Sequence, residues 1–168
     1  MRKTLSLTLI PHLPRFKLPI NHCFATALTI ALESLGYSIS RDQALELQCF
    51  HNQMESLNAD TFLPPHFKAY YGIHEIHSAG KTCVHQLTKP KSPTLIFACL
   101  IERRTAHCWA IIPEQDTFKL YNDTTTPGFH QRSTWAEIQD LLNAATVDGL
   151  PLASDPNQGW KQVVLNSG

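Results

Sequence analysis

The chain has no excess of charge of either sign, because 14 lysines and arginines balance 14 aspartates and glutamates. A protein that binds nucleic acid or an anionic membrane through a basic face needs such an excess, so both partners are disfavoured. The apolar stretch near the N-terminus is interrupted by Pro11 and Pro14 before it could cross a bilayer. We therefore expect no membrane association and no export signal.

Paired cysteines are also lacking. Five cysteines is an odd number and none forms a Cys-x-x-Cys pair, so we expect reduced thiols instead of a disulfide framework. Three pairs of candidate metal ligands can be read from the sequence: Cys49 with His51, His74 with His77, and Cys83 with His85. Their spacings differ from one another, whereas zinc ligands come in recurrent pairs, so we expect neither a metal nor another cofactor.

Apolar residues are plentiful, and they predict one domain. They make up 43% of the 168 residues, which is enough for one hydrophobic core, so we expect residues 1–168 to form a single domain. The first half predicts helices. An apolar run from residue 22 to 35 ends at Gly36, a second run begins after a Ser40 cap, and a short helix entered through prolines ends at Gly72.

The second half predicts an antiparallel sheet. The continuous apolar run SPTLIFACLI is typical of a central strand, and the stretches HCWAII and TFKLYN follow it on either side of the turn PEQD. A capping box, in which Ser133 or Thr134 precedes Glu137, predicts one more helix, and WKQVVL predicts a closing strand. Helices followed by antiparallel strands indicate the α+β class.

One cysteine stands where the chain could make it reactive. Cys23 begins the first predicted helix, where the positive end of the helix dipole favours a thiolate. A thiolate nucleophile also needs an imidazole and a group that orients it. His107 opens the strand HCWAII, and pairing across the PEQD turn would bring Asn122 or Asp123 back beside it. Cys108 should point away from that imidazole, because successive side chains of a strand alternate between faces.

The order of these residues resembles that of the papain-like cysteine peptidases. Within that superfamily the chain is most similar to the leader-processing peptidase domains of bacteriocin exporters and to the Josephin deubiquitinases. The similar stretches, in the family's order, are HCFATALTIALESLGYSISRDQALEL, YGIHEIHSAG, SPTLIFACL, AHCWAIIPEQDTFKLYND and TWAEIQDLL. The resemblance implies a papain-like fold, in which an N-terminal helical lobe packs on a C-terminal antiparallel β-sheet.

The resemblance also implies a catalytic triad. Cys23 would be the nucleophile, His107 the base, and Asn122 or Asp123 the residue that holds the imidazole in its productive tautomer. Counting sixteen residues from His107 favours Asp123, whereas the strand phase of the apolar residues in TFKLYN favours Asn122. Both residues stay open as the third member.

Two further roles follow from the resemblance. Such peptidases usually have a glutamine six residues before the cysteine as an oxyanion donor, and Lys17 stands there in this chain. The Cys23 amide would be one oxyanion donor, and Asn21 or Lys17 would supply the other. Trp109 would shield His107 or shape a substrate-binding groove, although a tryptophan on a half-buried strand is more often plain packing.

The activity implied is that of a thiol protease or amidohydrolase without a cofactor. It would act through a thioester on a peptide bond, an isopeptide bond or a glutamine side-chain amide of a protein or peptide substrate. We expect it in the cytoplasm, or delivered into a target cell as a bacterial effector. Two alternatives stay open: a transglutaminase-like acyltransferase or deamidase, to which HCWAII and LYNDTT are also similar, and a papain-like binding module without catalysis, which the lysine at position 17 favours.

Overall fold

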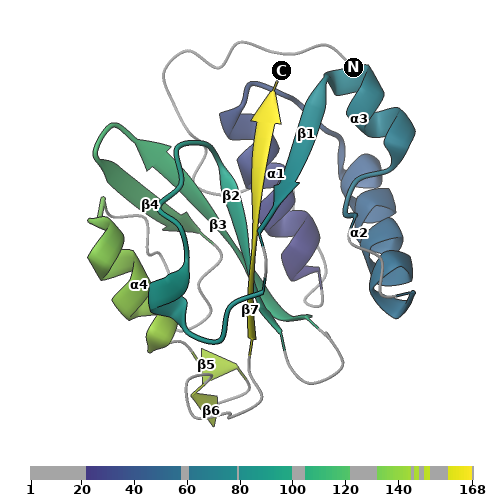
Figure 1. The fold of residues 1–168 in the computed structure, drawn as a ribbon. Coiled ribbons are helices and arrows are strands. Elements are labelled where there is room, and N and C mark those ends of the chain that lie inside the picture. The colour runs from purple at the N-terminus through teal and green to yellow at the C-terminus, as the bar shows by residue number, and fades with distance from the viewer. Residues whose placement is uncertain are drawn as a thin grey trace.

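Five antiparallel strands form the centre of the molecule, and helices cover both faces of the sheet (Figure 1). The computed structural model describes residues 22–57, 61–78, 80–99, 105–121, 132–144, 146–147, 150–151 and 159–167. The helical elements are α1 (Cys23–Ser34), α2 (Arg41–Ser56), α3 (Pro65–Tyr71), the 3₁₀ turn η1 (Val84–Gln86) and α4 (Trp135–Asn143). The strands are β1 (Ile73–His77), β2 (Thr94–Cys99), β3 (Thr105–Glu114), β4 (Thr117–Tyr121), β5 (Thr146–Val147), β6 (Leu150–Pro151) and β7 (Gly159–Ser167). These elements confirm the α+β class.

The order of strands in the main sheet is β1-β7-β2-β3-β4, and every neighbouring pair is antiparallel. β2 is central, as its continuous apolar run predicts. β7, the predicted closing strand, does not lie at an edge but inserts between β1 and β2, where Val163 and Leu165 are fully buried. β5 and β6 form a separate two-stranded sheet.

The first helix is buried almost all round, because it lies between the sheet and α2. Phe24, Leu28 and Leu32 are fully or nearly fully buried, and so is the polar Thr29. The Thr29 hydroxyl donates to the carbonyl of Ala25 at 2.7 Å, which removes the cost of burying it. α1 therefore forms the centre of the core on its side of the sheet.

Local signals set the ends of the other helices. The Ser40 side chain accepts from the Gln43 amide and the Gln43 side chain accepts from the Ser40 amide, so a complete capping box begins α2. Gly72 ends α3 with φ 65°, a left-handed conformation that glycine adopts without strain. Thr134, and not Ser133, caps α4. None of the helices within the described ranges is long and apolar enough to cross a lipid bilayer.

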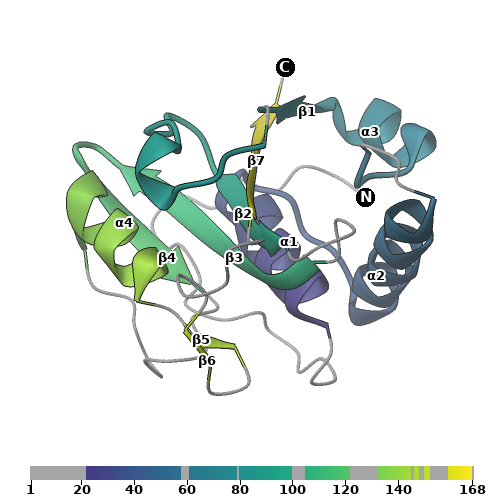
Figure 2. The same ribbon diagram turned by 60° about the horizontal axis from the view of Figure 1, so that its bottom comes forward.

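The sheet separates two hydrophobic cores. Figure 2 shows α1, with α2 beyond it, on one side of the sheet and α4 on the other. The α1-side core includes Phe24, Leu28, Phe62, Phe97, Cys108 and Tyr121. The α4-side core includes Val84, Trp109, Ile111, Phe118, Ile138 and Trp160. The helices of the first half thus cover one face, and a helix from the second half covers the other.

Candidate active site

Cys23 is the first residue of α1, and its half-buried side chain packs against the α1-side core. Burial raises the pKa of the Cys23 thiol, and the negative charge of Glu55 raises it further. Hydrogen bonds from the backbone amides of Cys108, Phe24 and Cys23 itself favour the thiolate and offset part of that rise. The expected lowering of the pKa at the helix start is therefore outweighed by burial, and the resting side chain is a thiol at neutral pH.

His107 immediately precedes Cys108, whose backbone favours the Cys23 thiolate. Its side chain belongs to β3 and is buried, and its ring meets that of Trp109 edge-on with centroids 4.5 Å apart. Cys108 packs in the α1-side core, whereas Trp109 packs in the α4-side core, which confirms the predicted alternation along this strand. The backbone of Cys108, which favours the Cys23 thiolate, thus follows His107 directly, whereas the His107 imidazole contacts Trp109 on the α4 side of the sheet.

The pairing of β3 with β4 brings the chain back toward His107. Tyr121, the last described residue of β4, lies opposite Ala110, three residues along β3 from His107. Asn122 and Asp123 follow directly but lie outside the described residues, as do the proposed oxyanion donors Asn21 and Lys17.

Tyr121 differs from a catalytic phenol in its environment. Its side chain is fully buried, and burial, together with the charge of Glu114, raises its pKa to about 12. Tyr121 is therefore neutral throughout the physiological range and serves the core.

Trp109 is fully buried, and its second aromatic neighbour is Trp160 at 5.9 Å between centroids. A side chain with no exposed surface has none to offer a substrate in this structure. Trp109 thus contacts His107 and is buried, and its part in a substrate-binding groove stays a prediction.

One face of α2 adjoins the start of α1, and of its residues the sequence marked only His51, as a candidate metal ligand with Cys49. Ala44, Gln48, His51 and Glu55 recur at spacings of four, three and four, so they share one face of the helix. The Gln48 side-chain oxygen accepts the Ala25 amide at 2.9 Å, and the His51 ring stacks on Phe24 with centroids 4.0 Å apart. Their helical spacing was the available signal, but polar residues at such positions usually face solvent.

His51 is paired as well as stacked. Its Nε2 lies 3.3 Å from a carboxylate oxygen of Glu55, one turn further along α2. The pair is carried on the same helix face as Gln48, so three polar side chains of α2 adjoin the first turn of α1.

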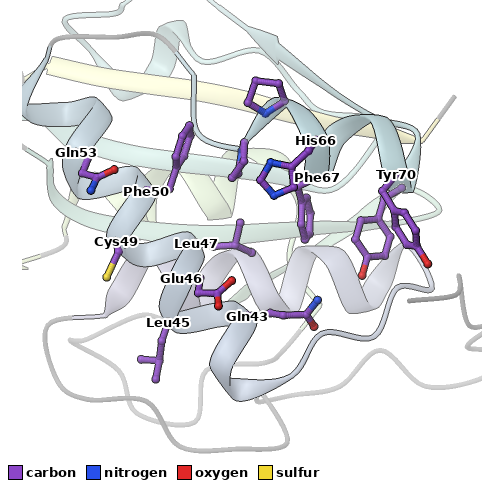
Figure 3. Close-up of a pocket in the computed structure, with 13 residues that line it drawn as sticks. Gln43, Leu45, Glu46, Leu47, Cys49, Phe50, Gln53, His66, Phe67 and Tyr70 are labelled. Carbon is purple, nitrogen blue, oxygen red and sulfur yellow. The ribbon is translucent and has the colours of Figure 1, made fainter.

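The opposite face of α2 borders a groove of about 860 Å³ between α2 and α3 (Figure 3). Its wall is mostly apolar, with polar groups at its rim. The lining residues are Gln43, Leu45, Glu46, Leu47, Cys49, Phe50, Gln53, Pro64, Pro65, His66, Phe67, Tyr70 and Tyr71. Neither Cys23 nor His107 lines this groove, so it is a separate surface feature.

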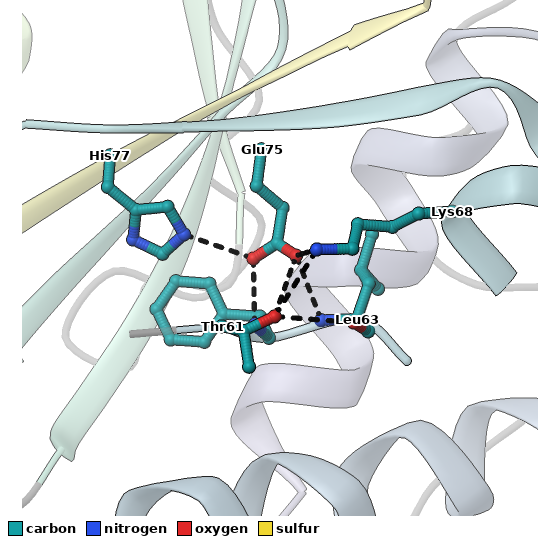
Figure 4. Close-up of polar contacts among 6 residues, drawn as sticks. Thr61, Leu63, Lys68, Glu75 and His77 are labelled. Atoms are coloured by element: carbon teal, nitrogen blue, oxygen red, sulfur yellow. Dashed lines mark hydrogen bonds and ion pairs between the residues drawn. The ribbon is translucent and has the colours of Figure 1, made fainter. Parts of the chain in front are cut away.

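A second cluster of charged groups surrounds Glu75 on β1 (Figure 4). Its carboxylate accepts hydrogen bonds from the amides of Phe62 and Leu63 at 2.7 and 3.2 Å, and it pairs with Lys68 at 3.2 Å and His77 at 3.1 Å. Burial alone would raise the pKa of Glu75, but these four partners together lower it. The carboxylate ties the segment after α2 to the sheet and to α3.

The described residues include no group of three or more histidine, cysteine, aspartate or glutamate side chains that could hold a metal ion. Comparison of the chain with protein-family models, with curated protein sequences and with solved structures found no match.

Proposed function

We propose that this protein is a papain-like cysteine hydrolase, with Cys23 as nucleophile and His107 as general base. The observation that carries the proposal is the position of Cys23 at the start of α1, packed against the core that contains Cys108, the residue directly after His107, whose backbone favours the Cys23 thiolate. Amide donors around a cysteine at a helix start stabilise negative charge on the sulfur as the proton leaves. The substrate class is a peptide bond, an isopeptide bond or a glutamine amide.

The raised pKa of Cys23 determines when its proton would be transferred relative to the attack on the substrate. Because the resting thiol keeps its proton, His107 would take that proton as the sulfur attacks the carbonyl carbon. A thiolate–imidazolium ion pair would not form before that step. The tetrahedral oxyanion would accept one hydrogen bond from the Cys23 amide and another from a second donor. Asn21 and Lys17 are the candidates for that second donor. His107 would return the proton to the departing amine, and a water molecule activated by His107 would then release the acid from the thioester.

Asn122 and Asp123 are the two candidates for the third member. β4 ends at Tyr121, so both follow directly after the strand that pairs with β3. Alanine substitution of the orienting residue should lower the reactivity of Cys23 more than substitution of the other, so the two variants together identify it.

A binding module built on the same fold is the second candidate. The raised pKa of the half-buried Cys23 favours it, because a thiol that stays protonated without a working base is an ordinary core residue. The two candidates differ in whether His107 changes the chemistry of Cys23.

The test is the rate of iodoacetamide labelling at each cysteine between pH 4 and 9, located by peptide mass mapping. Exposed Cys49 and Cys83 serve as ordinary reference thiols within the same molecule. We expect His107→Ala to slow the labelling of Cys23 near neutral pH and to leave the rates of Cys49 and Cys83 unchanged. A Cys23 rate that is the same in the wild type and in His107→Ala would refute the hydrolase and leave the binding module.

The outcome of the thioester step needs a separate measurement once a substrate is found. A primary amine added to the reaction would be incorporated into the substrate by a transglutaminase-like enzyme, whereas a hydrolase or deamidase would release acid. Cys23→Ala should abolish either reaction.

A further inference from the structure

The first turn of α1 is anchored by a residue from another helix. His22, the N-cap residue, makes no side-chain cap bond, and no acidic side chain lies in the first described turn of the helix. The Ala25 amide, the third in the helix, is instead satisfied by the Gln48 side chain at 2.9 Å. Such amides have no partner within a helix, so a buried one needs an external acceptor.

Gln48 is itself held in place. Its side chain is 4% exposed, and its nitrogen donates to the side-chain oxygen of Asn52 at 3.0 Å, one turn further along α2. The second bond fixes which end of the carboxamide faces Ala25, because only the oxygen can accept an amide hydrogen. α2 thus presents a rigid, neutral acceptor to the helix start that carries Cys23.

The Gln48 side chain carries no charge, and this affects how easily Cys23 forms a thiolate. Asp and Glu are common near helix starts, and a carboxylate in place of Gln48 would satisfy Ala25 equally well. It would also place a negative charge next to the developing thiolate and oppose its formation. A carboxamide anchors the turn without that penalty and leaves the Cys23 and Phe24 amides directed at the sulfur.

We propose that Gln48 is a positioning residue for the Cys23 nucleophile, acting through the first turn of α1. This inference rests on the proposed function of Cys23. The other titratable groups that adjoin the turn are His22, His51, Glu55 and Cys108. All of them stay unchanged in the variants that test the proposal.

The test compares the pH dependence of Cys23 labelling by iodoacetamide in three variants of the full chain. Gln48→Glu keeps the acceptor and adds charge, so the labelling midpoint should move up by about one pH unit and the rate at pH 7 should fall about tenfold. Asn52→Ala removes the partner of the Gln48 nitrogen at an exposed position, so the rate should fall less but in the same direction. Gln53→Ala, an exposed neighbour on the groove face, is the matched control and should leave the profile unchanged.

The outcomes separate this inference from the function on which it rests. If His107→Ala slows Cys23 labelling while folded Gln48→Glu and Asn52→Ala both keep the wild-type profile, Gln48 has no positioning role and the hydrolase proposal stands. If Gln48→Glu does not fold, as judged by circular dichroism, an unchanged profile in Asn52→Ala overturns the inference by itself. If His107→Ala leaves the Cys23 labelling rate unchanged, the hydrolase fails and the positioning role fails with it.

Discussion

The imidazole of His107 meets the indole of Trp109 edge-on, with ring centroids 4.5 Å apart, and the indole is completely buried. Edge-to-face contact of this kind holds a ring in one orientation and keeps water from one of its sides. The contact links the candidate base to the α4-side core. A substitution that disturbs the packing of that core should therefore also change the orientation of the His107 ring.

Trp109→Ala should destabilise the protein by about 3–5 kcal/mol, because it removes a large buried ring and leaves a cavity. Trp109→Phe should cost less, since it keeps an aromatic edge for His107. The free energy of unfolding in urea measures both. Trp135→Ala is the control, because Trp135 is only partly buried against the same core, and an equal loss for Trp109 and Trp135 would contradict the central position of Trp109.

Glu75→Gln should lower the free energy of unfolding by about 2 kcal/mol, because hydrogen bonds to a charged acceptor are stronger than those to a neutral one. The change keeps the shape of the side chain but removes the charge that pairs with Lys68 and His77. Glu46→Gln, at an exposed position on α2, is the matched control and should change stability little. Equal stabilities of the two variants would show that the Glu75 cluster contributes no more than a surface residue.

The same carboxylate predicts an acid-dependent loss of stability. Burial would raise the pKa of Glu75, but its hydrogen bonds and ion pairs lower it in the folded protein. A group with a lowered folded pKa stabilises the protein fully above its unfolded pKa, about 4.3 for glutamate, and loses that contribution as the pH falls through the folded pKa. The stability difference between wild type and Glu75→Gln should therefore shrink from pH 5 toward pH 3, and a difference that grows on acidification would be incompatible with the lowered pKa.

Short-range signals in the sequence predicted the helices and most strands correctly. The Ser40 cap, the left-handed Gly72 and the Thr134 box each act within four residues, so they can be read without knowledge of the tertiary structure. β1 was missed because its isoleucines, Ile73 and Ile76, are spaced by three and give no strand period. The insertion of β7 between β1 and β2 depends on pairing between distant segments, on which local patterns carry no information.

The sequence identifies candidate residues for the site but not their environment. Cys23 and His107 are candidates because of their order along the chain and the predicted elements that carry them. Gln48 anchors the first turn of α1 through the Ala25 amide, which lies 23 positions earlier in the chain. No local pattern in the sequence indicates this contact. Burial of the thiol, which reverses the expected direction of its pKa, is likewise a property of the packed core.

Substitution of Glu55 should change the pKa of the Cys23 thiol without altering the proposed catalytic residues. Burial is the main reason for the raised pKa of Cys23, and the Glu55 charge adds to it. Glu55→Gln removes only the charge, so the pKa of Cys23 should fall and a larger fraction of thiolate should exist at pH 7. The labelling of Cys23 should consequently accelerate at pH 7 and converge with the wild-type rate at high pH, where both proteins carry the thiolate. Glu46→Gln on the groove face of α2 should leave the Cys23 rate unchanged, and a slower rate in Glu55→Gln would mean that its pairing with His51, 3.3 Å away, supports the site more than its charge opposes it.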